Sequence, residues 1–172
     1  MKSAGLPLRI VPSGVNPKLA LLGWIALCAL VGGLGAIASV KAQEFYGQLD
    51  QPAWAPPAGV FGPVWTLLYI GMAVAAWLVW RERGWGRARG ALGLFVVQLA
   101  FNALWSWLFF AWHRGALAFA DIVLLLALIV ATIAAFARIR RAAAWLLVPY
   151  LAWVSFATAL CFSVWQRNPS VL

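Results

Sequence analysis

The sequence predicts an all-helical membrane protein, a bundle of five transmembrane helices with a structured first loop that acts as a lid. Two observations predict this fold. Five long apolar runs fill nearly all of the 172 residues, and 65% of the residues are hydrophobic whereas only 10% are charged. A soluble domain of this length would need polar faces on its helices, so we expect an integral, multi-pass membrane protein.

Each apolar run is long enough to cross a bilayer. Crossing about 30 Å of hydrocarbon takes roughly 20 residues, because every backbone amide must bond within its own helix. The predicted helices cover residues 19–38, 58–80, 91–112, 115–136 and 143–165. Strands of a β-barrel would alternate polar and apolar residues, but residues 122–135 contain a single polar residue, Thr132. The bundle is therefore expected over residues 19–168, between an N-terminal tail (1–18) and a C-terminal tail (169–172).

A secretory signal peptide is the alternative interpretation of the first run. Basic residues precede it, and residues 40–42 loosely resemble a cleavage site. Signal cores are about 7 to 15 residues long, and this run is longer. The length favours a retained membrane span.

The distribution of basic residues predicts the orientation, because short cytoplasmic loops retain Lys and Arg. Ten of the thirteen lie in the N-terminal tail and in the second and fourth gaps between runs, and the other three are Lys41, Arg114 and Arg167. We therefore expect a cytoplasmic N-terminus and an outward C-terminus. The net charge of +9 is then explained by anchoring and by anionic headgroups rather than by nucleic acid.

The sequence contains no conventional catalytic or metal-binding constellation. Cys28 and Cys161 lie in separate runs and are expected to be small core residues without a disulfide. His113 lies in the third turn, where a solvated side chain is favoured over an axial haem ligand. With a single histidine, no metal site of His/Cys spacing can be built.

The first gap, residues 39–57, is the longest connection and is expected on the outer side. It mixes aromatic residues with Pro52, Pro56 and Pro57, which stiffen the chain and prevent a continuous helix. The segment is interpreted as a lid over the bundle. An interfacial belt of aromatic side chains is the alternative, and both can hold.

Polar and aromatic residues form stripes in the outer half of the predicted bundle. Trp65 and Tyr69 share a helix face about 10 and 16 Å below the outer end. Gln98, Asn102 and Trp105 form a stripe on the third run. We expect these groups to converge beneath the lid. For the amides, the alternative is interhelical hydrogen bonding worth about 0.6 kcal/mol each.

The last two runs add further residues to the predicted site. On the fifth run Tyr150, Trp153, Ala157 and Cys161 form a stripe. Asp121 on the fourth run is expected about 9 Å below the outer end. An ionisable group at that depth costs a few kcal/mol unless it is partnered or protonated, so Asp121 indicates a cavity or a polar network.

Four segments together closely resemble the tryptophan-rich sensory protein family, also called the translocator protein or peripheral benzodiazepine receptor family. They are PAWAPP at 52–57, GPVWTLLY at 62–69, QLAFN at 98–102 and PYLAW at 149–153. The resemblance covers residues 45–168. It implies five tightly packed helices and a pocket below the first loop for porphyrins such as protoporphyrin IX, haem-like tetrapyrroles, sterols and synthetic aryl amides.

The resemblance also implies roles for individual residues. Trp65 and Trp153 match the two pocket tryptophans of the family, and Trp54 matches a lid tryptophan. Together with the stripes, this gives the candidate ligand-binding residues Trp54, Trp65, Tyr69, Gln98, Asn102, Trp105, Asp121, Trp153, Ala157 and Cys161. Porphyrin or haem is expected as a ligand, and no cofactor is required.

Three positions depart from the family pattern. Gly59 stands where many relatives carry another tryptophan, which implies a wider pocket rim. Phe162 replaces the tyrosine of the cholesterol-recognition pattern, which weakens a sterol interpretation. Gly93 is followed by Val97 rather than by a second glycine, so a homodimer is expected from the resemblance without its usual small-residue signature.

Three functions are consistent with these residues. The favoured one is a tetrapyrrole-binding sensor or transporter, with the macrocycle stacked between Trp65 and Trp153. The second is light-dependent porphyrin degradation, in which the same two indoles would be oxidised by the excited ligand. The third is a sterol or lipid carrier, or a scaffold for partner proteins.

Overall fold

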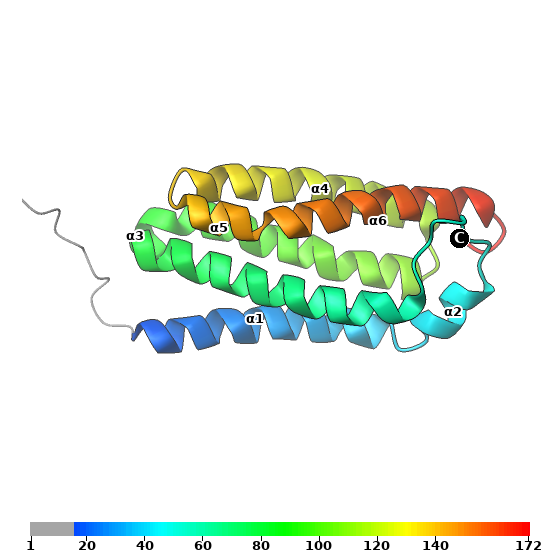
Figure 1. Ribbon diagram of the computed structural model, residues 1–172, viewed down its shortest axis with the longest axis horizontal. Coiled ribbons are helices and arrows are strands. Elements are labelled where there is room, and N and C mark those ends of the chain that lie inside the picture. Colours follow the sequence, from blue (N-terminus) through cyan, green and yellow to red (C-terminus); the bar gives the residue numbers. More distant parts are fainter. Residues whose placement is uncertain (1–15) are drawn as a thin grey trace, which may run out of the picture.

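Every apolar run of the sequence forms a helix in the computed structural model, which describes residues 16–172. The elements in chain order are α1 (Pro17–Ala38), α2 (Ala42–Gln48), η1 (Ala58–Val60), α3 (Phe61–Ser106), η2 (Trp107–Ala111), α4 (Gly115–Ala137), α5 (Arg141–Leu146) and α6 (Val148–Arg167). These residues include no β-strand. The long helices lie side by side along one axis (Figure 1).

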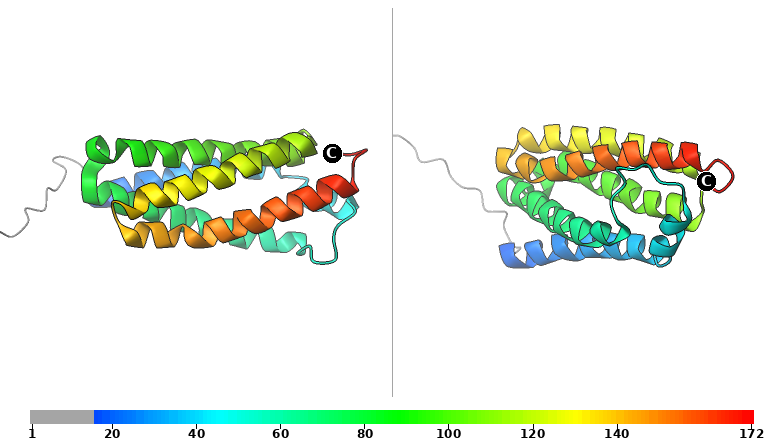
Figure 2. Two further views of the ribbon diagram at one scale, coloured as in Figure 1. Left: turned by 90° about the horizontal axis from the view of Figure 1, so that it is seen from above. Right: turned by 45° about the vertical axis from the view of Figure 1, so that its right-hand side comes forward.

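The helix α3 contains two of the five spans. Its 46 residues would measure about 70 Å if straight, more than twice the hydrocarbon thickness. Gly84 has φ 66° and ψ 172°, a conformation that glycine adopts without steric cost, and α3 doubles back there (Figure 2). Residues 61–83 are called its first half and residues 85–106 its second half.

This bend corrects the predicted boundary between the second and third helices. The gap expected at residues 81–90 is helical apart from Gly84. Arg, Glu and Ala, which make up six of these ten residues, are good helix formers, so one residue with positive φ suffices for the reversal. Within residues 16–172, four helical segments are long and apolar enough to cross a membrane. The segment that contains α3 crosses twice, and the predicted five-span bundle is confirmed.

The first and last spans differ from the predictions in detail. α1 begins two residues before the predicted start, because the Asn16 side chain accepts a hydrogen bond from the backbone amide of Lys18 at 2.9 Å and Pro17 occupies the first turn. The fifth predicted helix is two helices, α5 and α6, which meet at Leu147. Pro149 has no amide hydrogen to continue α5, and it lies instead in the first turn of α6.

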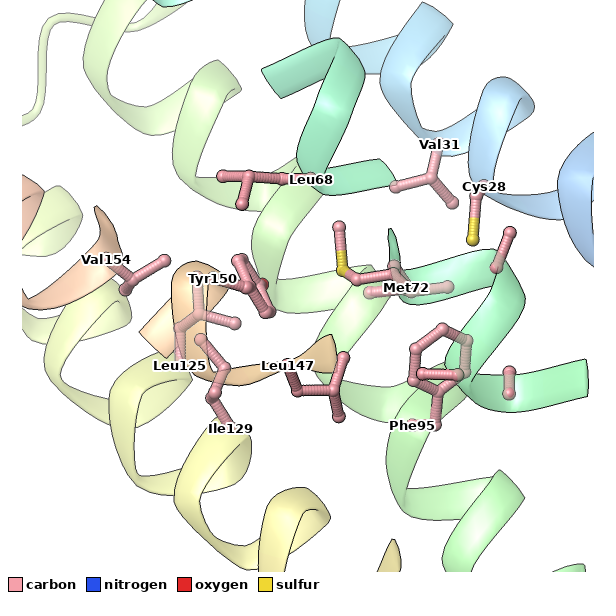
Figure 3. Packing of buried hydrophobic residues seen from close by; sticks show 14 of the residues in the cluster. Cys28, Val31, Leu68, Met72, Phe95, Leu125, Ile129, Leu147, Tyr150 and Val154 are labelled. Atoms are coloured by element: carbon pink, nitrogen blue, oxygen red, sulfur yellow. The ribbon is translucent and has the colours of Figure 1, made fainter. Parts of the chain in front are cut away.

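The core is built from side chains of all five spans. Figure 3 shows Cys28 of α1 and Met72 and Phe95 from the two halves of α3 in one packed cluster with Leu125 of α4 and Tyr150 of α6. Many large apolar side chains on the outer faces of the helices are exposed. An apolar exterior around an apolar core is expected for a bundle whose solvent is lipid.

The two ends of the bundle differ in charge. One end, the arginine end, contains the start of α1, the α3 bend and the α4–α5 turn (Figure 1). There Arg140 forms an ion pair with Glu82 at 2.9 Å. The described residues thus place the basic second and fourth gaps on one side, as the charge pattern predicted. Lys2 and Arg9 lie outside the described residues.

The first loop crosses the opposite end, called here the α2 end. Its first part is the helix α2, and its second part, residues 49–57, runs without helix to η1. Asn168, at the end of α6, holds this second part: its Oδ1 accepts from the Asp50 amide at 2.9 Å, and its Nδ2 donates to the Asp50 carbonyl at 3.0 Å. We call this pair of hydrogen bonds the Asn168 clamp.

Candidate ligand cavity

A cavity of about 650 Å³ lies between α1, α2 and the two halves of α3, near the α2 end. This volume is in the range of roughly 300 to 1,000 Å³ that is usual for small-molecule sites. Its lining consists of Ile25, Cys28, Ala29, Gly32, Gly35, Ala36, Ser39, Val40, Ala42, Gln43, Tyr46, Ala58, Phe61, Gly62, Trp65, Thr66, Tyr69, Ile70, Ala73, Asn102, Trp105, Ser106 and Phe110.

The two walls of the cavity have different compositions. α1 contributes small residues, among them Ala29, Gly32 and Ala36, whereas α3 contributes the aromatic rings of Trp65 and Trp105. Among residues 16–172, the lining includes no Asp, Glu, Lys, Arg or His. Such a chamber favours a flat, largely apolar molecule that can stack on an indole.

Tyr69 and Asn102 form the polar floor of the cavity, and a directed chain of hydrogen bonds runs from them into the core. The Tyr69 hydroxyl donates to Asn102 Oδ1 at 2.5 Å, and Asn102 Nδ2 donates to the Tyr150 hydroxyl at 3.0 Å. Tyr150 in turn donates to Gln98 Oε1 at 2.8 Å, and Gln98 Nε2 lies 3.9 Å from Met72 Sδ. This relay connects both halves of α3 with α6, so its polar groups satisfy one another without a ligand.

Two other hydrogen-bond donors on lining residues do not take part in this relay. Within the described part of the chain, the Tyr46 hydroxyl and the Trp105 Nε1 are buried and have no partner. A buried donor without an acceptor costs about 1 to 3 kcal/mol. The cavity therefore has a satisfied floor, and two of its other lining residues carry buried donors without a partner among the described residues.

Four of the ten candidate residues line the cavity: Trp65, Tyr69, Asn102 and Trp105. They come from both halves of α3, and their two predicted stripes face each other across the cavity floor. Gln98 is buried two hydrogen bonds beyond Asn102 in the relay and does not reach the lining.

Both remaining tryptophans of the candidate set lie outside the cavity. Trp153 of α6 packs edge-on against Phe61, with ring centroids 5.8 Å apart, and Phe61 is the ring that lines the cavity. Trp153 instead borders a second hollow of about 500 Å³ between α6 and the first half of α3. Trp54, in the loop, is exposed and contacts Phe156 edge-on at 5.7 Å.

The candidates on α4 and the remainder of α6 are buried elsewhere in the bundle. Asp121 is 7% exposed, and its Oδ2 has no partner among the described residues. Ala157 and Cys161 are buried members of the core. None of the three belongs to the lining, so the convergence that the stripes predicted takes place on α3 and not on α4. A helical stripe identifies a buried face, but not the helix that this face meets.

Sequence reasoning missed the contribution of α1 and α2. The α1 run carries no polar stripe, and Cys28, which belongs to the packed core as predicted, also lines the cavity. Tyr46 was interpreted as part of a lid or belt. A signal was available for α1 in the spacing of Ala29, Gly32 and Ala36, because small residues on one helix face leave space beside it.

The departures from the family pattern have visible consequences. A Cβ added at Gly59 would meet nothing within 4 Å, and the neighbouring Ala58 lines the cavity, which agrees with an open rim. Phe162 is exposed on the outside of α6, where it contacts Phe119 at 5.1 Å. It lies away from the cavity.

Fold and site together define a multi-pass helical membrane protein with a ligand-sized cavity beneath a structured loop. The comparisons with known proteins agree with this class. The model of the TspO/MBR family matches residues 24–166, so the chain belongs to that family. The resemblance found in the sequence is thereby confirmed.

Curated relatives match over most of their length. The chain is 44% identical over 148 residues to the tryptophan-rich protein TspO of Chlorobaculum tepidum, covering 84% of this chain and 93% of the relative. It is 40% identical over 127 residues to the human translocator protein, covering 73% and 75%. It is 38% identical over 147 residues to the tryptophan-rich sensory protein of Cereibacter sphaeroides, covering 86% and 90%.

Proposed function

We propose that this protein binds a tetrapyrrole, such as protoporphyrin IX or a haem-like macrocycle, and acts as its sensor or transporter. The observation that carries the proposal is the cavity of about 650 Å³ with uncharged, partly aromatic walls. The names of the relatives, sensory protein and translocator protein, support a role of this kind. The charge pattern further supports a cytoplasmic arginine end, which would open the cavity toward the outer leaflet.

The proposed ligand pose follows from the walls. The macrocycle stacks on Trp65 and Trp105 and lies against the small residues of α1, which leave room for a flat ring system. Its carboxylates point to the α2 end, where Ser39 and Gln43 form a polar rim. Trp153 contacts the ligand in this pose only after Phe61 moves, because Phe61 stands between that indole and the cavity.

Equilibrium titration with protoporphyrin IX tests the proposal. We expect a Kd in the micromolar range or tighter for the full chain in detergent, and about threefold to tenfold weaker binding for Trp65→Phe, because one stacking surface shrinks. The matched control is Trp145→Phe, whose indole is 72% exposed at the arginine end. Equal affinities for all three proteins would contradict the assignment.

Light-dependent porphyrin degradation is a second candidate function. Two indoles, Trp65 and Trp105, line the cavity directly and would touch a bound photosensitiser. Illumination of the protoporphyrin complex in the presence of oxygen tests it, with products counted per protein. Many turnovers per protein would establish an enzyme, whereas less than one turnover means oxidative damage to the protein.

A sterol carrier is a third candidate, since the uncharged walls also suit a sterol. A thermal-shift comparison of protoporphyrin IX, haem, cholesterol and an aryl carboxamide separates these ligands, because a ligand selective for the folded state raises the melting temperature. We expect protoporphyrin IX to raise the melting temperature more than cholesterol does. A shift with cholesterol alone would overturn it.

A further inference from the structure

Tyr46 is a residue of the cavity that no step of the proposed function uses. It lies on α2, its side chain is 6% exposed, and it belongs to the cavity lining. Its ring packs edge-on against Phe61, with centroids 5.6 Å apart and an interplanar angle of 78°. The ring is thus fixed by an aromatic contact, while its hydroxyl finds no acceptor among the described residues.

Apart from the Trp105 indole, whose Nε1 also has no partner among the described residues, the polar groups deep in the cavity are already occupied. The Tyr69 hydroxyl and the Asn102 amide belong to the relay. The Thr66 hydroxyl donates to the Gly62 carbonyl of its own helix at 3.0 Å. An acceptor on the ligand that bonds to Tyr69, Asn102 or Thr66 would have to displace one of these bonds, whereas the Tyr46 hydroxyl can donate without loss elsewhere.

The backbone around Tyr46 is held in place before any ligand arrives. The Gln51 side chain donates to the Tyr46 carbonyl, and the Asn168 clamp ties the preceding residue of the loop, Asp50, to α6. On the neighbouring position, Phe45 stacks on His113 with centroids 4.1 Å apart. Because this donor is already fixed, little further conformational entropy is lost when it binds a ligand.

Tyr46 remains a donor at neutral pH. Burial raises the pKa of its phenol above the ordinary value, because desolvation penalises the phenolate. A raised pKa means that the proton stays on the oxygen throughout the neutral range. Because no acceptor for this proton lies among the described residues, a bound ligand is the group that would supply one.

We infer that the Tyr46 hydroxyl is the hydrogen-bond donor with which the cavity holds a carboxylate of its tetrapyrrole ligand. The inference rests on the proposed function and adds a specificity-determining residue to it. Since the lining formed by the described residues carries no cation, the carboxylate is held by a neutral donor at the loop end of the cavity. A hydrogen bond to an ionised acceptor is about twice as strong as a neutral one.

The test compares two porphyrins on wild-type protein and on Tyr46→Phe, which removes only the hydroxyl. Protoporphyrin IX carries carboxylates, and etioporphyrin carries alkyl groups in their place. We expect Tyr46→Phe to weaken protoporphyrin IX about tenfold or more and to leave etioporphyrin unchanged. Ser155→Ala removes an exposed hydroxyl on α6 and serves as the control that changes neither affinity.

Thermal unfolding without ligand provides the second readout. Because the Tyr46 hydroxyl has no acceptor within the described protein, Tyr46→Phe is expected to leave the melting temperature unchanged or to raise it. A clear loss of stability would show a structural role and overturn the inference. So would an equal effect on both porphyrins, or no effect on either. Wild-type protein that binds neither porphyrin would overturn the proposed function as well.

Discussion

Among the single residues that the structure describes, the buried polar groups of this protein are of two kinds, those with a hydrogen-bond partner and those without one. Tyr69, Asn102, Tyr150 and Gln98 satisfy one another in a relay across three spans. Tyr46, by contrast, is buried with its hydroxyl unpartnered among the described residues. Groups of the first kind stabilise the bundle, and we infer that Tyr46, which belongs to the cavity lining, donates to a ligand.

Tyr150→Phe tests this distinction. The change leaves Gln98 Oε1 and Asn102 Nδ2 buried without their partner, so we expect it to lower the free energy of unfolding by about 1 to 3 kcal/mol. The measurement is unfolding in detergent, followed by circular dichroism. The matched variant is Tyr46→Phe, which removes the same atom. Equal stability of the two variants would contradict the distinction.

The sequence predicted the members of the relay but not their connections. Tyr69, Asn102 and Gln98 were identified because polar side chains at helical spacing within an apolar run must share a face. The partner of each could not be predicted, since that depends on how far the helices are rotated against one another. Tyr46 could not be assigned for a related reason: the loop is positioned by Asn168, more than a hundred residues away in the chain.

At the scale of elements, the first loop is held by a contact with the end of α6. The Asn168 clamp pairs both backbone groups of Asp50, and Asn168 Nδ2 also lies 2.7 Å from the Val164 carbonyl of its own helix. The ion pair between Arg167 and Asp50, at 3.6 Å, is largely solvated and adds little. The clamp is therefore the main polar restraint on the loop.

Asn168→Ala is expected to loosen the first loop while the five spans stay folded. It removes two hydrogen bonds worth about 1 kcal/mol each, so amide exchange over residues 42–57 should accelerate roughly tenfold or more. Hydrogen exchange with mass spectrometry measures this. Asp50→Asn is the control, because it removes the ion pair but keeps the backbone groups. Unchanged exchange in Asn168→Ala would show that the loop is held otherwise.

The membrane spans could be predicted from the sequence, but the conformation of the segments that connect them could not. Length and hydropathy determine which residues cross the bilayer. The reversal at Gly84 was expected as a ten-residue gap, since four arginines within ten residues resemble a loop. The Arg and Ala residues continue the helix, however, and a single residue with positive φ makes the turn.

At the scale of the whole molecule, the cavity lies on one side of the bundle. It is walled by α1, α2 and the two halves of α3, whereas α4, α5 and α6 pack into the core behind it. The protein therefore combines a packed half, joined to the cavity floor by the relay, with a half in which small residues on α1 leave space. This division explains why only four of the ten candidate residues reach the cavity.

The two free cysteines provide the most direct test that a ligand occupies this cavity. Cys28 and Cys161 are both buried, at 1% and 2% exposure, but only Cys28 lines the cavity. The measurement is the rate of modification by a small, membrane-permeant thiol reagent in two single-cysteine variants, Cys161→Ala and Cys28→Ala. The rate for each thiol is compared with and without protoporphyrin IX.

We expect protoporphyrin IX at ten times its Kd to slow modification of Cys28 about tenfold, because the rate follows the unoccupied fraction of the protein. The rate at Cys161 stays the same. Protection of Cys161 alone, equal protection of both thiols, or an unprotected Cys28 under conditions where binding is saturated would contradict the claim that the cavity beside α1 is the binding site.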